Sequence, residues 1–374
     1  MKRIKDFYKQ YPILFASIQL IVFLYLFFLS LGMMGGSLKL FGKDFSETLI
    51  ATTSNPFVGL FIGILATSII QSSSSTTSIV VGMVAAGAFS LDPEISIKLA
   101  IPIIMGANIG TSITNTIASL PQINRSNEFK RAFSAATVHD FFNFLSVIIL
   151  FPLQLATNFL GIIATKMEEL FSGVGGLQFL SPVKAITNPV VEIVKDYFKE
   201  IDLPWLMFVL AILLLFVALK YMVSSLKIIV VTRAKDWFDN YLFKTAARAF
   251  ALGIILTIMV QSSSITTSLI VPMAGAGLLT LEQIFPYTLG SNIGTTITAI
   301  LAALLTGSPA AIIVAFAHTL FNISGIVLLW PLKKLPILLA RNFAEYSTRN
   351  KIIPVTYVIV LFFLIPLLVI FIFN

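Results

Sequence analysis

A polar octapeptide occurs twice in this chain of 374 residues: QSSSSTTS occupies Gln71–Ser78, and QSSSITTS occupies Gln261–Ser268. The first copy follows the apolar stretch Gly59–Ile70. Eight consecutive polar residues cover every face of a helix, and lipid cannot satisfy their hydrogen bonds. We therefore predict a broken helix or re-entrant hairpin at each copy, with its tip inside the protein at the middle of a membrane.

The composition agrees with a membrane protein. Apolar residues make up 57% of the chain and charged residues 11%, and the mean hydropathy is +0.96, whereas soluble domains are about 25% charged. The absence of Cys excludes a disulfide scaffold and zinc-thiolate centres. The net charge of +8 comes from basic residues dispersed along an apolar chain, which is unlike the basic stripe of a nucleic-acid-binding protein.

Five apolar runs are long enough to cross a bilayer as helices, and the segments between them are shorter and interrupted by polar or Gly-rich residues. The first run is too long and too bulky for a cleaved signal peptide, so we interpret it as a retained helix. The five runs are Tyr11–Met34, Ala132–Leu153, Pro204–Val230, Ala310–Pro331 and Ile352–Phe373.

The charged loops predict the orientation, because cytoplasmic loops carry an excess of Lys and Arg. Basic residues dominate Met1–Gln10, Arg125–Arg131, Lys227–Arg248 and Lys333–Lys351, which we place in the cytoplasm. Lys166–Asp202 has four Lys and six acidic residues, which indicates an external loop. The N-terminus is therefore expected in the cytoplasm.

The octapeptide belongs to a longer internal repeat. In both units the same motifs flank it in the same order, which indicates duplication of about 150 residues. The paired segments are Gly106–Thr114 (GANIGTSIT) with Gly290–Thr298 (GSNIGTTIT), His139–Asn143 (HDFFN) with His318–Asn322 (HTLFN), and Leu31–Leu40 with Leu219–Ile228.

Combined with the loop charges, the repeat predicts two units of opposite orientation. Helix Tyr11–Met34 runs from inside to outside, whereas its counterpart Pro204–Val230 runs the other way. Inverted repeats are typical of alternating-access transporters. We expect an all-α polytopic membrane protein with two inverted-topology repeats whose broken hairpins meet at the midplane. The expected divisions are a cytoplasmic N-terminus (1–10), the first repeat (11–165), an external loop (166–202), the second repeat (203–342) and a C-terminal membrane helix (343–374).

A helix that starts at each octapeptide offers free N–H donors and the positive end of its dipole, which together favour an anion. Two such tips from inverted halves predict a site for a small oxyanion. The alternative interpretation is that the Ser and Thr residues only pack helices together.

The Gly-x-Asn-Ile-Gly-Thr runs predict cation ligands. Their glycines permit close backbone approach and unwinding, and unwound carbonyls beside amide and hydroxyl oxygens bind sodium in transporters. The candidate oxygen donors are Asn108, Thr111, Asn292 and Thr295. Ordinary small-residue helix packing is the alternative.

The two histidines, His139 and His318, each lie one helical turn before an asparagine. We favour a buried hydrogen bond between helices over a proton relay. Asp140 is an acid inside an apolar helix, and it either binds a cation or pairs with Lys130 or Arg131.

The doubled QSSS motif, the run GANIGTSITNTIASL from Gly106 and the run EFKRAFSAATVHDFFNFLSVIILFPL from Glu128 closely resemble type II sodium-dependent phosphate cotransporters. The resemblance spans both repeats and implies a sodium-coupled symporter of inorganic phosphate, without a further cofactor and without enzymatic activity. It implies phosphate contacts from Ser72, Ser73, Ser74, Arg125, Ser262, Ser263 and Ser264. With the candidates above, the expected sodium ligands are Gln71, Asn108, Thr111, Gln122, Asn143, Gln261, Ser291, Asn292, Thr295 and Thr298.

One position departs from the family pattern. Electrogenic members carry Asp immediately before the Arg that corresponds to Arg125, and this chain has Asn124. One sodium site and the net charge movement therefore remain open. The short segment Gly173–Pro204 replaces the long external loop of animal members, which favours a prokaryotic protein of the cell (inner) membrane. Its partners would be phosphate, sodium and the bilayer, with a homo-oligomer left open and no nucleic acid.

Three other functions are compatible with parts of the pattern. A channel would need a continuous polar pore, whereas the polar motifs cluster at two places. A sodium-coupled carrier of sulfate, arsenate or a carboxylate would share the same motifs. An intramembrane serine hydrolase would need one nucleophile, and the chain has no G-x-S-x-G elbow.

Overall fold

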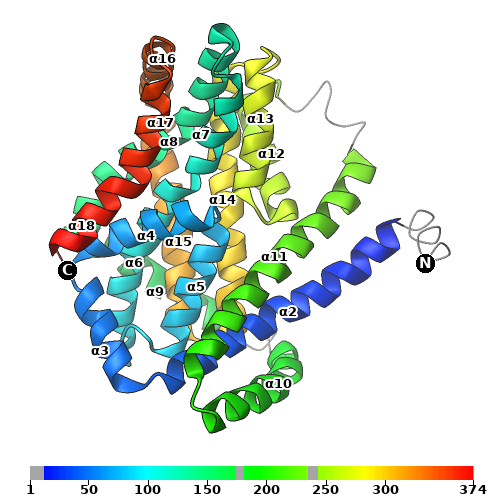
Figure 1. Cartoon of the computed structure of the whole chain (residues 1–374), viewed down its shortest axis with the longest axis vertical. Helices are drawn as coiled ribbons and strands as arrows, with labels where there is room; N and C mark the ends of the chain where they lie inside the picture. The colour runs from blue at the N-terminus through cyan, green and yellow to red at the C-terminus, as the bar shows by residue number, and fades with distance from the viewer. Residues whose placement is uncertain (1–11, 174–180, 235–242, 374) are drawn as a thin grey trace.

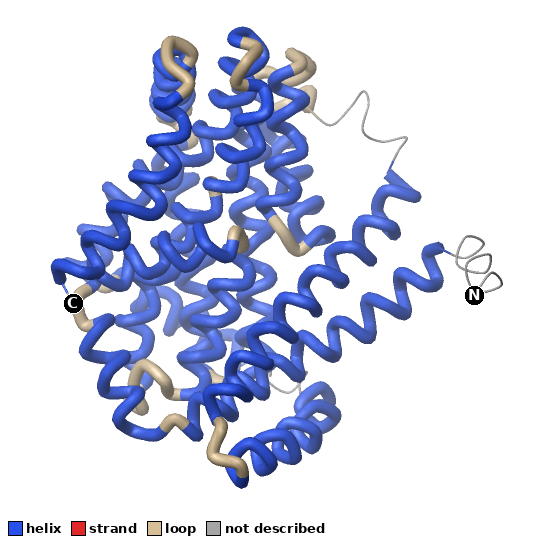
Figure 2. Tube along the Cα trace, in the orientation of Figure 1, coloured by secondary structure: helices blue, strands red, loops and turns tan. Residues whose placement is uncertain are grey.

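The computed structural model describes residues 12–173, 181–234 and 243–373, which form helices and loops without any strand (Figure 2). The first half contains α2 (Pro12–Leu40), α3 (Gly42–Thr53), α4 (Pro56–Ile70), α5 (Ser73–Ala86), α6 (Pro93–Thr111), α7 (Ile113–Ser119), η1 (Leu120–Gln122), α8 (Ser126–Thr157) and α9 (Phe159–Gly173). The second half contains α10 (Ser181–Glu200), α11 (Pro204–Ala234), α12 (Ala246–Val260), α13 (Ser263–Gly275), α14 (Leu281–Thr306), α15 (Pro309–Leu329), α16 (Lys334–Ser347), α17 (Ile352–Ile359), η3 (Val360–Leu364) and α18 (Ile365–Phe373).

Several helix starts follow directly from the local sequence. Asn55, Asp92 and Ser308 each cap a helix with a side-chain oxygen, and a proline follows at the first helical position. This proline costs no hydrogen bond, because the first N–H groups of a helix have no partner within the helix. Thr280 and Gln283 form a capping box at the start of α14.

Two helix pairs approach so closely that only glycine fits between them. A Cβ atom on Gly106 of α6 would lie 1.9 Å from the Leu60 carbonyl oxygen of α4. In the second half, a Cβ atom on Gly290 of α14 would lie 2.0 Å from the Phe250 carbonyl oxygen of α12. The pairs α4–α6 and α12–α14 are therefore built in the same way.

The predicted unwinding at the Gly-x-Asn-Ile-Gly-Thr runs is wrong. Helix α6 continues through Thr111 and is interrupted only at Ser112, and α14 is continuous from Leu281 to Thr306. These glycines serve the close packing described above, so α6 and α14 are long helices rather than short interrupted pieces.

Helices α2 and α11 lie side by side and run in opposite directions (Figure 1). Phe23 and Tyr221 stack between them, with their ring centroids 4.7 Å apart. Helix α10 packs across both of them. The segment Lys166–Asp202, expected as a loop, therefore consists largely of helix, and Val191 and Phe198 bury one face of α10.

Helices of the first half pack between and against helices of the second half. Helix α5 of the first half contacts α14 and α15 of the second, while α13 of the second half contacts α7 and α8 of the first. Likewise α9 packs on α15, and α16 packs on α8. The continuous helix α17–η3–α18 crosses one side of this bundle and ends beside α4 (Figure 1).

Six helical segments within the described residues are long and apolar enough to cross a membrane. They are Pro12–Leu38, Pro93–Gln122, Ser126–Thr157, Leu281–Thr306, Pro309–Leu329 and Ile352–Phe373. Beside the octapeptides, helices α4, α5 and α12 are apolar but shorter, at 14 or 15 residues. A helix that ends at a break in the middle of the membrane crosses only part of the bilayer, so short helices are expected beside the octapeptides.

Candidate binding site at the two helix breaks

The first octapeptide forms a sharp break between α4 and α5. Gln71 ends α4 with a left-handed backbone conformation (φ 55°), and its N–H donates to the Thr67 carbonyl oxygen at 2.7 Å. Ser72 is extended and caps α5, because its hydroxyl accepts from the Ser75 N–H at 3.2 Å. The predicted interruption of the helix is confirmed here.

The second octapeptide repeats this geometry between α12 and α13. Gln261 has the same left-handed φ of 55°, and the Ser262 hydroxyl accepts from the Ile265 N–H at 3.4 Å. A left-handed conformation costs a residue other than glycine about 1–2 kcal/mol, and such strain concentrates at functional sites. Its presence at both breaks indicates that the shape of the break is itself required.

The two breaks meet. The Ser264 hydroxyl of the second break donates to the Gln71 carbonyl oxygen of the first at 3.3 Å. A cavity of about 440 Å³ lies beside this contact. It is lined by Gln71, Ser72, Ser75, Thr114, Phe216, Lys220, Ser224, Gln261, Ser262, Ser264, Ile265 and Ser268.

The predicted phosphate-binding serines divide into two groups. Ser72, Ser262 and Ser264 line the cavity. Ser73, Ser74 and Ser263 are buried in the first turns of their helices and do not line it. Ser73, Ser74 and Ser263 lie where helix N–H donors have no carbonyl partner within the helix. Their backbone N–H groups, rather than their buried hydroxyls, are therefore the candidate donors to an anion.

Gln261 and Thr298, both predicted sodium ligands, are brought together. The Thr298 hydroxyl donates to the Gln261 side-chain oxygen at 3.0 Å. In the first half the corresponding residues are Gln71 and Thr114, which both line the cavity. Thr114 was not predicted, although the repeat alignment pairs it with Thr298, and its buried hydroxyl has no hydrogen-bond partner among the described residues.

A second polar cluster joins the halves through asparagine side chains. Asn143 donates to the Asn108 carbonyl oxygen at 2.7 Å, and Asn292 donates to the Asn143 side-chain oxygen at 3.0 Å. Asn322 donates to the Asn108 side-chain oxygen at 3.1 Å. Three predicted sodium ligands therefore converge, together with one that sequence reasoning left out of the site.

His139 extends this cluster. Its Nε2 lies 2.6 Å from the Asn292 side-chain oxygen, and its Nδ1 lies 3.2 Å from the side-chain nitrogen of Asn115. The Thr267 hydroxyl of α13 in turn donates to Asn115 at 2.7 Å. The buried hydrogen bond between helices predicted for His139 is confirmed. The same prediction is wrong for His318, whose ring nitrogens have no hydrogen-bond partner in the described part of the chain.

The other predicted sodium ligands are not connected to these clusters through their side chains. The hydroxyls of Thr111 and Thr295 donate to carbonyl oxygens of their own helices, and Ser291 is fully buried in α14. Gln122 lies in η1, and its buried side-chain oxygen has no hydrogen-bond partner among the described residues.

Arg125 does not line the cavity. It precedes α8, its side chain is 73% exposed, and it forms an ion pair with Glu128 at 3.0 Å. The neighbouring Asn124 accepts a hydrogen bond from Lys351 at 2.8 Å on the surface. The lysine that does line the cavity is Lys220 of α11, which sequence reasoning missed.

Of the two alternatives for Asp140, the pairing with Lys130 or Arg131 is wrong. Asp140 accepts hydrogen bonds from the Thr116 hydroxyl at 3.1 Å and the Tyr357 hydroxyl at 2.9 Å. Lys130 instead pairs with Glu345, and Arg131 donates to the Gly275 carbonyl oxygen. The wrong prediction came from sequence proximity, since Tyr357 is brought near only by tertiary packing.

Taken together, the fold and the site define a polytopic all-helical membrane protein with a polar centre between two helix breaks. The Na+/Pi-cotransporter family model matches residues 26–179 and 214–333. The chain belongs to this family.

Curated relatives agree with this assignment. The sodium-dependent phosphate transport protein 2B of Homo sapiens is 34% identical over 449 residues, which cover 94% of this chain and 64% of the relative. Protein 2A of Mus musculus is 34% identical over 430 residues, which cover 94% of this chain and 66% of the relative. The chain thus spans slightly less than two thirds of these relatives. No solved structure matches it.

Proposed function

We propose that the protein is a sodium-coupled symporter of inorganic phosphate that works by alternating access. The observation that best supports this proposal is the contact between Ser264 and Gln71. It places two serine-capped helix starts beside one cavity, and helix starts bind phosphate through their free N–H groups and dipoles.

Phosphate would bind in this cavity between the two breaks. Ser72, Ser262 and Ser264 offer hydroxyl donors there, and the side-chain amides of Gln71 and Gln261 offer more. The backbone at Ser73, Ser74 and Ser263 would contribute the helix N–H groups.

Sodium would use the neutral oxygen donors around the breaks. Gln261 with Thr298, and Asn108 with Asn143 and Asn292, already share hydrogen bonds, and amide, hydroxyl and carbonyl oxygens suit a hard cation. Bound sodium would offset the negative charge of phosphate, so that each ion raises the affinity for the other. The predicted ligands Thr111, Gln122, Ser291 and Thr295 would belong to the same system.

The antiparallel pair α2 and α11 supports repeats of inverted topology, because counterpart helices must then run in opposite directions (Figure 1). Such repeats can exchange inward-open and outward-open arrangements around a fixed site. We further propose a location in the cell (inner) membrane, with a cytoplasmic N-terminus, on the basis of the loop charges.

The proposal is tested by uptake of radiolabelled phosphate into proteoliposomes at clamped voltage. We expect saturable uptake that requires an inward sodium gradient. Uptake without sodium, or none at all, would contradict the proposal. The effect of voltage on the rate would show whether net charge moves in a chain that has Asn124 at the departing position.

A carrier of another oxyanion would use the same kind of helix starts. Competition by unlabelled sulfate, arsenate and small carboxylates at equal concentration distinguishes it, because the true substrate inhibits most strongly. A channel would give uptake that does not saturate.

A further inference from the structure

Lys220 lies near the middle of α11, a helix whose 31 residues include no acidic residue. A charged side chain within the span of an apolar membrane helix is costly, and such residues usually serve binding or transport. Among the residues that the structure describes, no carboxylate forms an ion pair with Lys220. Its ammonium lies 5.8 Å from the centroid of the neighbouring Tyr221 ring.

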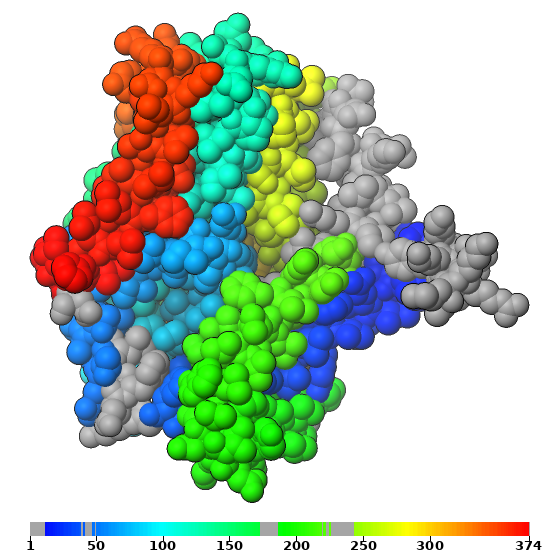
Figure 3. Space-filling model, in the orientation of Figure 1, coloured from blue at the N-terminus to red at the C-terminus, as the bar shows by residue number. Residues whose placement is uncertain are grey.

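Lys220 belongs to the face of α11 that lines the cavity. Phe216, Lys220 and Ser224 are spaced by four residues, which places them on one side of the helix, and all three line the cavity. In Figure 3 the surface of α11 (green) adjoins the surface of the first half (blue). Helix α11 also contacts α5, which begins at the first break, and α12, which ends at the second.

Among the described residues that line this cavity, only Lys220 carries a formal charge. The other described lining residues are Ser, Thr, Gln, Phe and Ile, and none is acidic or basic. Neutral hydroxyls and helix dipoles hold a phosphate anion less strongly than donors that include a cation, because charge-assisted hydrogen bonds are the stronger ones.

The repeat shows that this charge is not part of the shared framework. In the alignment of Leu31–Leu40 with Leu219–Ile228, Lys220 corresponds to Gly32 and Ser224 corresponds to Gly36. A Cβ atom on Gly32 would lie 2.7 Å from the Val191 side chain of α10, so that position is filled by helix packing.

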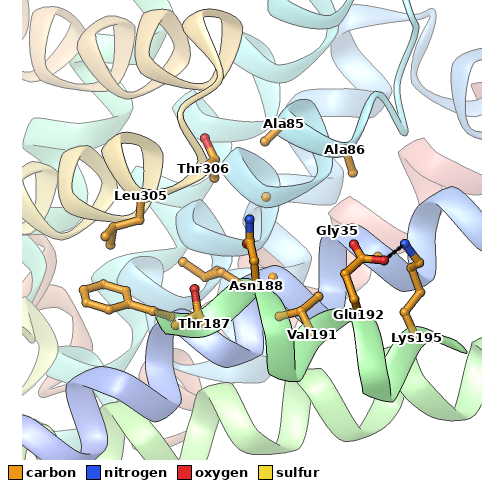
Figure 4. Close-up of a pocket in the computed structure, with 15 residues that line it drawn as sticks. Gly35, Ala85, Ala86, Thr187, Asn188, Val191, Glu192, Lys195, Leu305 and Thr306 are labelled. Carbon is orange, nitrogen blue, oxygen red and sulfur yellow. Dashed lines mark hydrogen bonds and ion pairs between the residues drawn. The ribbon is translucent and has the colours of Figure 1, made fainter. Parts of the chain in front are cut away.

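Gly32, Gly35 and Gly36 of α2 line a separate cavity of about 280 Å³, which α10 borders (Figure 4). Its lysine, Lys195, is already paired with Glu192. Among its described lining residues, the cavity beside α2 therefore has no unpaired cation, whereas the cavity beside α11 has Lys220.

We propose that Lys220 is a substrate-binding residue whose ammonium contacts the bound phosphate from α11, across the cavity from the two helix breaks. This inference rests on the proposed function. It assigns to α11 the positive charge that the resemblance placed on Arg125. The bound phosphate then links α11 to both breaks.

The test compares Lys220→Gln and Lys220→Arg with the wild type in proteoliposomes. Uptake of radiolabelled phosphate is measured against phosphate concentration at saturating sodium. Loss of a charged hydrogen-bond partner costs about 1.5–3 kcal/mol, so we expect Lys220→Gln to raise the phosphate KM by at least about tenfold. Lys220→Arg should recover much of the affinity, and thermal unfolding of both variants should match the wild type.

Lys195→Gln is the matched control, because it removes the lysine of the other cavity and should leave the phosphate KM unchanged. Equal KM values for the wild type and Lys220→Gln would overturn the inference, as would a folded Lys220→Arg protein as weak as Lys220→Gln. Absence of sodium-dependent uptake in the wild type would instead overturn the proposed function, so the two failures are distinguishable.

Discussion

Helices α2 and α11 occupy corresponding places in the two repeats, yet their facing surfaces differ. Gly32 of α2 is packed against Val191, whereas Lys220 of α11 lines the cavity between the breaks. The breaks themselves show the opposite relation, because Gln71 and Gln261 share the same φ of 55°. The duplication thus preserved the backbone of the two breaks, while the helices beside them diverged.

A similar divergence surrounds the two glutamines. Gln261 is already bonded to Thr298, whereas the hydroxyl of the corresponding Thr114 has no partner among the described residues. The second break is therefore the more completely bonded of the two. Four experiments test whether the two repeats share the backbone of the breaks but differ in the side chains around them.

The largest effect is expected from Gly106→Ala and Gly290→Ala. Each new Cβ would lie within 2.0 Å of a carbonyl oxygen on the neighbouring helix, and overpacking costs about 1–3 kcal/mol or more. Both variants should lose most folded protein from the membrane, as measured by size-exclusion yield and unfolding temperature. Gly59→Ala is the control, since its nearest contact of 3.4 Å is ordinary. A strong effect in only one half would show that the helix pairs are not equivalent.

Gln261→Ala should weaken sodium activation of phosphate uptake by about tenfold, since it removes a hydrogen-bonded oxygen from a polar site. Gln71→Ala should have a smaller effect, because Gln71 has no corresponding bond to Thr114. The measurement is uptake rate against sodium concentration. Combining Gln261→Ala with Thr298→Ala should add little further loss, and fully additive losses would argue against a shared site.

Tyr357→Phe should lower the free energy of unfolding by about 1–3 kcal/mol, because it removes a donor from the buried Asp140. Only the first repeat has this acid, since Thr319 occupies the corresponding position of the second repeat. Thermal unfolding in detergent measures the change. Tyr346→Phe, on an exposed ring, is the control, and equal unfolding temperatures for both variants would show that the bond adds no stability.

The smallest effect is expected at the surface pair Lys130–Glu345, which connects α8 with α16. The hydrogen bond and charge of Lys130 lower the pKa of Glu345. A lowered pKa stabilises the folded state above the ordinary Glu range, and this contribution is lost as pH falls through the folded-state value. The small difference in unfolding temperature between the wild type and Glu345→Gln should therefore vanish in acid. A difference that grows in acid would contradict this assignment.

The pattern of the sequence predicted the backbone features well, because they follow from local chemistry. The octapeptide is polar throughout in the first copy and is interrupted only by Ile265 in the second. Such a run is unfavourable as an unbroken helix in lipid, so both breaks were predictable, as were the Ser72 and Ser262 caps. Thr114 could also have been found, because the repeat pairs it with Thr298. The roles of individual side chains were harder to predict from the sequence. For Asp140 the sequence offered cation binding or pairing with nearby Lys130 or Arg131, whereas one of its hydrogen-bond donors, Tyr357, lies 217 residues away.

The membrane class, the duplication and the two helix breaks follow from the sequence alone, since hydropathy, repeated motifs and capping residues act over short distances. Tertiary packing was needed to show which serines line the cavity, that Lys220 rather than Arg125 lies there, and that the Gly-rich runs are packing surfaces on unbroken helices. These outcomes depend on how helices from the two repeats approach each other. That approach is set by close packing between residues that are distant along the chain.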